Sequence, residues 1–162
     1  INYGLEKSLY LGNLNSKRDW GHAKDYVYMQ WLMLQQEKPE DFVISTGEMH
    51  TVREFIDLCA IKLGWNKSKD TSGIIWEGEG LNEIGRRADT GEIVIRIDPR
   101  YFRPTEVDEL LGDSSKAKEK LNWQPQISLE ELISEMIEAD SNESMKESIL
   151  KNKGFPIYSS RE

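Results

Sequence analysis

Cysteine and histidine are scarce in this sequence: of its 162 residues, one is cysteine and two are histidine. A lone thiol, Cys59, excludes an intramolecular disulfide and makes a cytoplasmic protein the simplest interpretation. The positions of His22, His50 and Cys59 match no spacing typical of zinc ligands, so we predict no metal site.

Long apolar runs and an excess of positive charge are also missing. No segment approaches the roughly 18 consecutive apolar residues of a membrane-spanning helix. The net charge of −8 argues against a broad electrostatic surface for nucleic acid or for an anionic membrane, and we expect neither as a partner. An anion would therefore have to bind locally, through a few arginines in an acidic background.

The sequence does contain enough apolar material for a packed domain, since 38% of its residues are hydrophobic. Short apolar runs predict strands at residues 9–11, 42–45, 74–77 and 93–97, the second of them buried on both faces. Periodic apolar residues predict helices at about 22–36, 52–63, 114–121 and from 129 onward.

Two of these helices begin with a capping box, formed by Thr51 with Glu54 and by Ser128 with Glu131. The helix at 22–36 is expected to bury one stripe of side chains, with Met29 and Trp31 off it. The stripe consists of Ala23, Tyr26, Val27, Gln30, Met33 and Leu34.

The glycine-rich segment 78–91 invites comparison with a phosphate-binding loop. It contains neither G-x-G-x-x-G nor G-x-x-x-x-G-K-[ST]. We therefore predict a long, mobile hairpin excursion between two strands.

The densest group of recognition side chains lies at residues 98–108, where Arg100 and Arg103 flank two aromatic residues. Arginine offers a planar fork of donors suited to phosphate, and Glu106 offers acceptors suited to a sugar hydroxyl. An anion site and a surface turn with internal ion pairs are equally compatible with this group. Upstream, Arg18 next to Asp19 is compatible with a phosphate contact or, slightly better, with local pairing.

Several long segments, in order, resemble one protein family. They are Arg18-Asp19-Trp20 and residues 42–48, 51–55, 76–83, 98–107, 111–117 and 121–123. From about residue 5 to about 140 the chain resembles the C-terminal half of extended short-chain dehydrogenases/reductases acting on nucleotide sugars, and among them the GDP-mannose 4,6-dehydratase family.

The resemblance implies an α/β fold: a substrate-binding part with a strand and helices that would complete a Rossmann sheet, plus a small hairpin and helices. Residues 1–140 would form the nucleotide-sugar-binding part, and residues 141–162 a C-terminal extension. Members of the family oxidise C4 of the mannose with NADP, eliminate water across C5–C6 and return the hydride to C6. GDP-mannose would be the substrate, GDP-4-keto-6-deoxymannose the product and a homo-oligomer the assembly.

The sequence departs from the family in lacking the glycine-rich dinucleotide loop. Its one Tyr-x-x-x-Lys pattern, Tyr3 with Lys7, lies in what reads as the end of a helix, without the strands that should precede it. We therefore expect the NADP site and the catalytic residues to lie upstream of Ile1, assign no catalytic residue here, and expect the chain alone to be inactive.

The resemblance also implies substrate-binding residues. Arg18 and Arg103 would grip the diphosphate, Glu106 would accept from a ribose hydroxyl, and the turn at Gly12 and Asn13 would run past the guanine. Arg100 is expected to be structural, paired with a nearby carboxylate. The alternatives are another nucleotide-sugar epimerase or reductase of the same superfamily, and a non-catalytic nucleotide-binding module.

Overall fold

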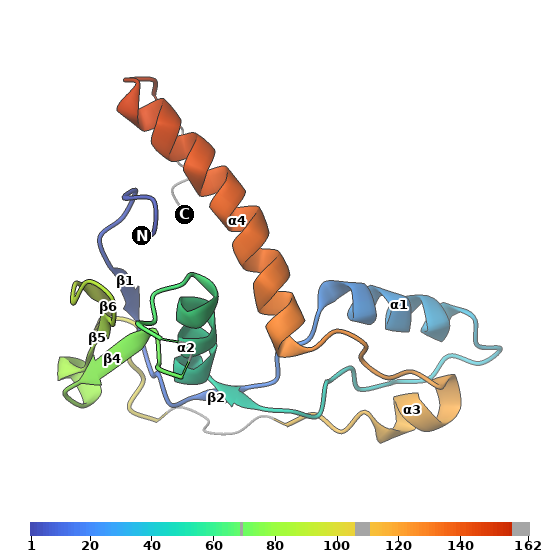
Figure 1. Ribbon diagram of the computed structural model, residues 1–162. Coiled ribbons are helices and arrows are strands. Elements are labelled where there is room, and N and C mark those ends of the chain that lie inside the picture. The colour runs from blue at the N-terminus through green and yellow to red at the C-terminus, as the bar shows by residue number, and fades with distance from the viewer. Residues whose placement is uncertain (69, 106–110, 157–162) are drawn as a thin grey trace. The chain divides into compact units, whose positions relative to one another are not determined.

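The computed structural model describes residues 1–68, 70–105 and 111–156, which fall into two compact units. The first unit combines Ile1–Gly12, Asp57–Arg103 and the chain from Ser134 on; the second combines Asn13–Ile56 with Pro104–Ile133. The elements of both are labelled in Figure 1. We describe each unit by itself.

A four-stranded sheet forms the centre of the first unit, in the order β1-β6-β5-β4. The strands are β1 (Leu9–Leu11), β4 (Ile74–Glu77), β5 (Ile84–Arg87) and β6 (Ile93–Ile97). β1 pairs with β6 in parallel, and β6, β5 and β4 form an antiparallel meander. The strands predicted at 9–11, 74–77 and 93–97 are confirmed.

The prediction of a mobile excursion at 78–91 is wrong. The segment contains the short helix η1 (Gly80–Asn82) and the strand β5, which lies between β4 and β6. Gly85 in β5 is buried, and a Cβ atom there would lie 3.0 Å from atoms of Ile74, Trp76 and Ile95. The sequence of β5, Ile-Gly-Arg-Arg, has no apolar run. At Gly85 the side chains of the neighbouring strands fill the space that a side chain would otherwise occupy.

One end of the helix α2 (Val52–Lys62) belongs to the first unit and supplies its buried Ala60. The backbone at Gly73 approaches Ala60 so closely that a Cβ atom on Gly73 would lie 2.7 Å from the alanine Cβ. Trp76 Nε1 donates a hydrogen bond of 3.1 Å to the carboxylate of Asp57 on the same helix. These contacts hold α2 to β4.

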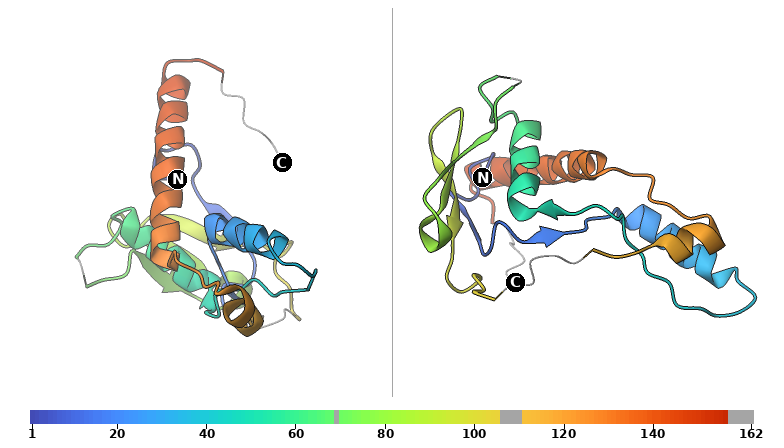
Figure 2. Two further views of the ribbon diagram at one scale, coloured as in Figure 1. Left: turned by 90° about the vertical axis from the view of Figure 1, so that its right-hand side faces the viewer. Right: turned by 90° about the horizontal axis from the view of Figure 1, so that it is seen from below.

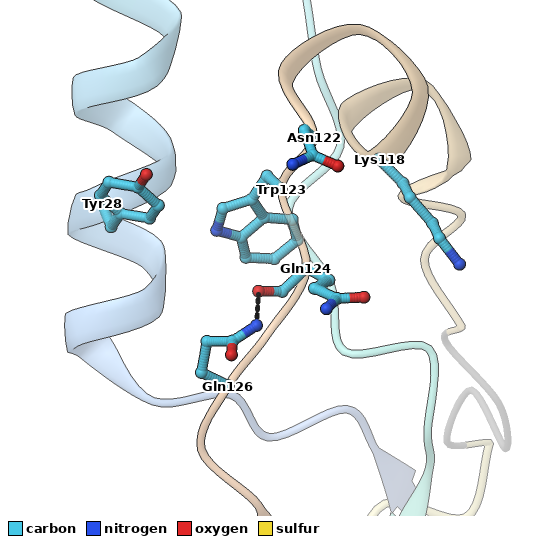
Figure 3. Close-up of a pocket in the computed structure, with 6 residues that line it drawn as sticks. All are labelled: Tyr28, Lys118, Asn122, Trp123, Gln124 and Gln126. Carbon is cyan, nitrogen blue, oxygen red and sulfur yellow. Dashed lines mark hydrogen bonds between the residues drawn. The ribbon is translucent and has the colours of Figure 1, made fainter.

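The core of the second unit is formed by α1 (Ala23–Leu34), α3 (Ser115–Leu121) and the segment after α3 (Figure 2). Its buried residues are Met29, Ala117, Leu121 and Trp123. Trp123 follows α3 (Figure 3). Its indole N–H donates to the carbonyl of Asp25 at 3.0 Å.

The predicted buried stripe of α1 is wrong at several positions. Val27 and Leu34 are exposed at 61% and 81%, whereas Met29 is completely buried. Asp25, one turn before Met29, is also buried because its carboxylate accepts from the amides of Gln126 and Ile127, each at 3.0 Å. Apolar periodicity does not identify an aspartate as a buried residue.

The predicted strand at 42–45 is also wrong. The segment has no ladder partner among the described residues and is not assigned as a strand. Phe42 and Ile44 pack against the core of the second unit, while Val43 between them is 50% exposed. The segment therefore buries one side, not both.

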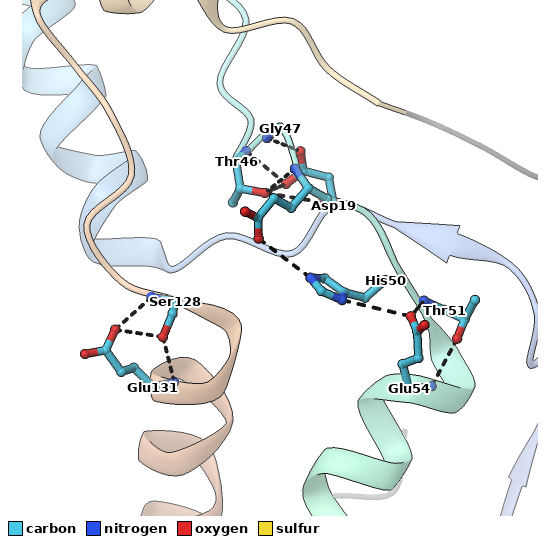
Figure 4. A network of polar contacts seen from close by, with 9 residues as sticks. Asp19, Thr46, Gly47, His50, Thr51, Glu54, Ser128 and Glu131 are labelled. Carbon is cyan, nitrogen blue, oxygen red and sulfur yellow. Dashed lines mark hydrogen bonds and ion pairs between the residues drawn. The ribbon is translucent and has the colours of Figure 1, made fainter.

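The remaining elements are the ribbon of β2 (Lys17–Arg18) with β3 (His50–Thr51) and the helix α4 (Leu129–Asn152). Both capping boxes are confirmed. The amide of Glu54 donates to Thr51 Oγ1 at 3.0 Å and that of Thr51 to Glu54 at 2.7 Å; the corresponding distances for Ser128 and Glu131 are 3.2 and 2.8 Å (Figure 4).

The start of the described chain differs from expectation. Residues 1–7 form turns instead of the end of a helix, and α4 continues without interruption past residue 140. Among the described residues, no helix is both long and apolar enough to cross a membrane.

Candidate functional site

The candidate site in the first unit lies at the carboxyl edge of the parallel pair β1–β6. Leu11 lies opposite Ile97 at the last position of both strands, and the amide of Asp98 donates to the carbonyl of Leu11 at 2.8 Å. Gly12 and Asp98 therefore leave the sheet side by side. In α/β proteins, the carboxyl ends of parallel strands are the usual place for a ligand.

Gly12 is required by the close approach of the chain that follows β6. A Cβ atom on Gly12 would lie only 2.2 Å from the carbonyl oxygen of Tyr101. No residue with a side chain fits there unless the backbone moves. The predicted site residue Gly12 is thus brought against the segment that carries Arg103.

Asp98 organises that segment through its side chain and its backbone. Its carboxylate accepts from the Arg100 amide at 2.9 Å and from Arg100 Nη2 at 2.6 Å, and its carbonyl accepts from the amides of Tyr101 and Phe102 at 3.0 and 3.1 Å. The Arg100 guanidinium and amide hold the pKa of the Asp98 carboxyl below its ordinary value. The expected pairing of Arg100 with a nearby carboxylate is confirmed.

Arg103 follows this turn as an exposed residue. Its exposure is compatible with a contact to a bound phosphate. Glu106 lies outside the described residues, so its contact with a ribose hydroxyl stays a prediction.

Arg18 and Asn13 belong to the second unit. Arg18 lies opposite His50 in the β2–β3 ribbon, and its Nη1 donates to the carbonyl of Lys17 at 2.7 Å. Asn13 is half-buried. Their contacts with a nucleotide stay predictions.

Asp19, next to Arg18, anchors the loop that follows residue 45. Its carboxylate accepts from the amide and hydroxyl of Thr46 at 3.0 and 2.6 Å and from the amide of Gly47 at 3.0 Å (Figure 4). This contact was not predicted, although a Thr-Gly pair after an apolar run offers the donors that a carboxylate needs. Asp19 thereby fixes the backbone that carries Arg18.

The surroundings of His50 and Cys59 do not indicate a catalytic role for either side chain. His50 lies 3.9 Å from both Glu48 and Glu54 at the surface. Burial raises the pKa of the Cys59 thiol to about 11, so it is not an activated nucleophile at neutral pH. No group of three potential metal ligands occurs in the part of the chain that the structure describes.

A separate pocket of about 300 Å³ lies in the second unit (Figure 3). It is lined by Tyr28, Lys118, Asn122, Trp123, Gln124 and Gln126. None of the predicted substrate-binding residues that the structure describes, Gly12, Asn13, Arg18 and Arg103, lines it.

Comparison with known proteins decides the family. A family model described as GDP-mannose 4,6 dehydratase matches residues 1–136. The chain belongs to the GDP-mannose 4,6-dehydratase family. The resemblance found in the sequence is thereby confirmed.

Relatives in this family come from bacteria and animals. The GDP-mannose 4,6-dehydratase of Yersinia enterocolitica is 50% identical, over 97% of this chain and 43% of the relative. The human GDP-mannose 4,6 dehydratase is 54% identical, over 86% of this chain and 36% of the relative. The chain thus spans about two fifths or less of the length of these relatives.

Solved structures support the α/β fold class. RMD from Pseudomonas aeruginosa, complexed with NADPH, aligns with a TM-score of 0.62 at 16% identity, over 90% of this chain and 39% of that one. UDP-glucose 4-epimerase from Thermotoga maritima, solved with UDP-glucose, aligns with a TM-score of 0.58 at 25% identity, over 84% of this chain and 35% of that one. The fold class predicted from the sequence is confirmed.

Proposed function

We propose that this chain is the GDP-sugar-binding part of an NADP-dependent GDP-mannose 4,6-dehydratase. The complete enzyme would convert GDP-mannose to GDP-4-keto-6-deoxymannose. The proposal rests on the carboxyl edge of β1–β6 in a chain of this family. At this edge Gly12 contacts the turn that the Asp98–Arg100 pair stabilises and that leads to Arg103. Residues 1–140 would form the binding part and residues 141–162 an extension.

The arginines would bind the diphosphate. In an acidic protein, two guanidinium forks can neutralise a diphosphate and match its oxygens with paired donors, and we assign Arg18 and Arg103 to this role. Gly12 and Asn13 would lie along the guanine, with Gly12 allowing the backbone to come close. Glu106 would accept from a ribose hydroxyl.

NADP does not fit the residues of this chain. The sequence has no G-x-G-x-x-G loop to cradle a pyrophosphate. We therefore assign the cofactor to the rest of the longer protein and assign this chain no step of the hydride transfer. Its proposed contribution is to bind and orient the GDP-sugar.

We further propose a homo-oligomeric, cytoplasmic enzyme. The cytoplasmic location is supported by the single cysteine, Cys59, which leaves no intramolecular disulfide to form in an oxidising compartment. The oligomer follows from the resemblance to the family.

The diphosphate contacts are tested by replacing Arg103 or Arg18 with alanine in the complete enzyme. Each substitution should weaken GDP-mannose binding by on the order of 2 kcal/mol or more, because a charge-assisted contact to phosphate is lost. Isothermal titration calorimetry measures the affinity. Arg86→Ala is the control, since Arg86 pairs with Glu77 on the sheet. Unchanged affinity in both variants would remove the diphosphate assignment.

A second measurement concerns the chain alone. Mixed with GDP-mannose and NADP, the isolated chain should form no product, because we assign it neither the cofactor site nor the catalytic residues. Product formation detected by chromatography would contradict this division of roles.

A further inference from the structure

The turn after β6 connects a buried carboxylate to the candidate phosphate ligand. The Asp98 side chain is 11% exposed, whereas that of Arg100 is 78% exposed. Arg100 is therefore not required to fill space, and its position is fixed mainly by its contacts with Asp98. Its Nε atom lies 3.1 and 3.0 Å from the two carboxylate oxygens, in addition to the Nη2 contact.

The same aspartate joins three pieces of backbone. Its amide donates to Leu11 at the end of β1, its carboxylate accepts from the Arg100 amide, and its carbonyl accepts from the amides of Tyr101 and Phe102. The turn stacks directly on Gly12, whose Cα faces the Tyr101 carbonyl. The backbone that presents Arg103 is thus tied to the sheet through Asp98.

The charges of the pair also bear on an anion held at this edge. An unpaired carboxylate would repel a diphosphate, and an unpaired Arg100 would compete with Arg103 for it. The close contact between the two side chains neutralises both charges. Arg103, at the end of the turn, is an exposed residue.

We propose that Asp98 and Arg100 are positioning residues for the GDP-sugar: they hold the turn on Gly12 so that Arg103 meets the diphosphate, without contacting the ligand themselves. This inference rests on the proposed function. It assigns a role in substrate binding to an ion pair whose cationic partner, Arg100, is mostly exposed to solvent.

The first unit contains a matched control pair. Arg87 and Asp89 have the same spacing of two residues and a bidentate contact, with distances of 3.0 and 2.7 Å. Arg87 is the last residue of β5, and its amide donates to the carbonyl of Glu92 just before β6 begins. Because β5 and β6 are antiparallel, Arg87 lies at the opposite edge of the sheet from Asp98.

The test uses the complete enzyme and GDP as the titrated ligand. Asp98→Asn should weaken GDP binding about tenfold, and Arg100→Ala by a similar factor, because the turn loosens. The KM for GDP-mannose should rise by a comparable factor, with kcat within about twofold of the parent. Asp89→Asn should leave both the GDP affinity and KM unchanged.

A double-mutant cycle tests whether Asp98 acts through Arg103. If Asp98 acts through Arg103, then Asp98→Asn should cost less than about twofold once Arg103 is already alanine. Additive losses in the cycle would overturn the positioning role. Arg100→Ala, at an exposed site, keeps the cycle available if Asp98→Asn does not fold.

Three further outcomes separate the possibilities. Tighter GDP binding by Asp98→Asn would show that the released Arg100 binds the diphosphate itself, and would overturn the inference. Unchanged GDP affinity in both Asp98→Asn and Arg100→Ala, with weaker binding by Arg103→Ala, would overturn the inference but leave the proposed function standing. Unchanged affinity in Arg103→Ala and Arg18→Ala would remove the diphosphate assignment, and with it the inference.

Discussion

Asp19, Asp25 and Asp98 each anchor a backbone segment. Asp19 accepts from the amides of Thr46 and Gly47, Asp25 from those of Gln126 and Ile127, and Asp98 from that of Arg100. Buried or half-buried carboxylates that accept hydrogen bonds from backbone amides fix loops that have no ladder of their own. In an acidic sequence such residues are easily taken for solvated surface charge.

Asp25 offers the clearest stability prediction for a single residue. Asp25→Ala would leave the amides of Gln126 and Ile127 without their acceptor, so we expect a loss of about 2–4 kcal/mol in the free energy of unfolding. Urea unfolding followed by circular dichroism measures the change.

The matched control for Asp25 is the exposed Glu37, just after the same helix. Glu37→Ala should change the free energy of unfolding by less than about 0.5 kcal/mol. Asp25→Asn should lie between the two, because a neutral amide oxygen can still accept from both N–H groups but binds them more weakly than a carboxylate. Equal losses for Asp25→Ala and Glu37→Ala would refute the anchoring role.

Helix starts were predictable at the scale of elements because their signals are local. Thr51 with Glu54, and Ser128 with Glu131, lie three residues apart and make the expected reciprocal bonds. The strand β5 was not predictable because its sequence, Ile-Gly-Arg-Arg, has no apolar run, although its partners β4 and β6 are close in sequence. The segment 42–45 was predicted wrongly as a strand because burial alone does not provide a pairing partner. An apolar run such as Phe42-Val43-Ile44 predicts burial, but not a ladder partner.

The candidate site was also predictable only in part. The pairing of Arg100 with a nearby carboxylate was predicted and is confirmed, since both residues lie within one turn. The contact of Gly12 with Tyr101 could not be predicted, because it arises from the parallel register of β1 with β6. The contacts of Asp19 were also not predicted, because its partners lie 27 and 28 residues away along the chain.

The sheet depends on β5 having no side chain at residue 85. Gly85→Val would place methyl groups against Ile74, Trp76 and Ile95, which already lie 3.0 Å from a Cβ position. We expect the free energy of unfolding to fall by about 1–3 kcal/mol, the usual effect of overpacking.

Thermal unfolding of the variants measures this effect. Ile75→Val, at a 47% exposed position of the neighbouring strand, is the control and should shift the midpoint by no more than a degree or two, roughly. A Gly85→Val variant as stable as the Ile75→Val variant would show that β5 is not packed as described.

For the whole molecule, the charge distribution predicts sensitivity to acid. Both units contain carboxyl groups whose pKa is lowered by a hydrogen bond or a nearby cation. They are Asp89 and Asp98 in the first unit, and Glu40, Asp113 and Glu131 in the second.

A carboxyl group with a lowered pKa in the folded state stabilises the fold above its unfolded pKa, roughly 4 for Asp and Glu. That stability is lost as the pH falls through the folded pKa. The melting temperature should therefore be nearly constant from about pH 7 to 5 and then decrease below about pH 4. Scanning calorimetry across this range checks it, and an unchanged midpoint at pH 3 would contradict it.

High salt separates the causes of this acid sensitivity. About 1 M NaCl should screen the ion pairs of Glu40, Asp89 and Asp98 but leave the capping bonds of Asp113 and Glu131. The acid transition should therefore become smaller in salt without disappearing.

The parallel pairing of β1 with β6 also has a consequence for how the chain is synthesised. Leu9 pairs with Ile95, and the neighbouring bond from Ser8 to Ile93 joins residues 85 positions apart. At translation rates of about 5–20 residues per second, β1 leaves the ribosome roughly 4–17 s before its partner exists. The first unit therefore cannot complete its sheet, or the edge at which Gly12 meets Tyr101, until most of the second unit has been made.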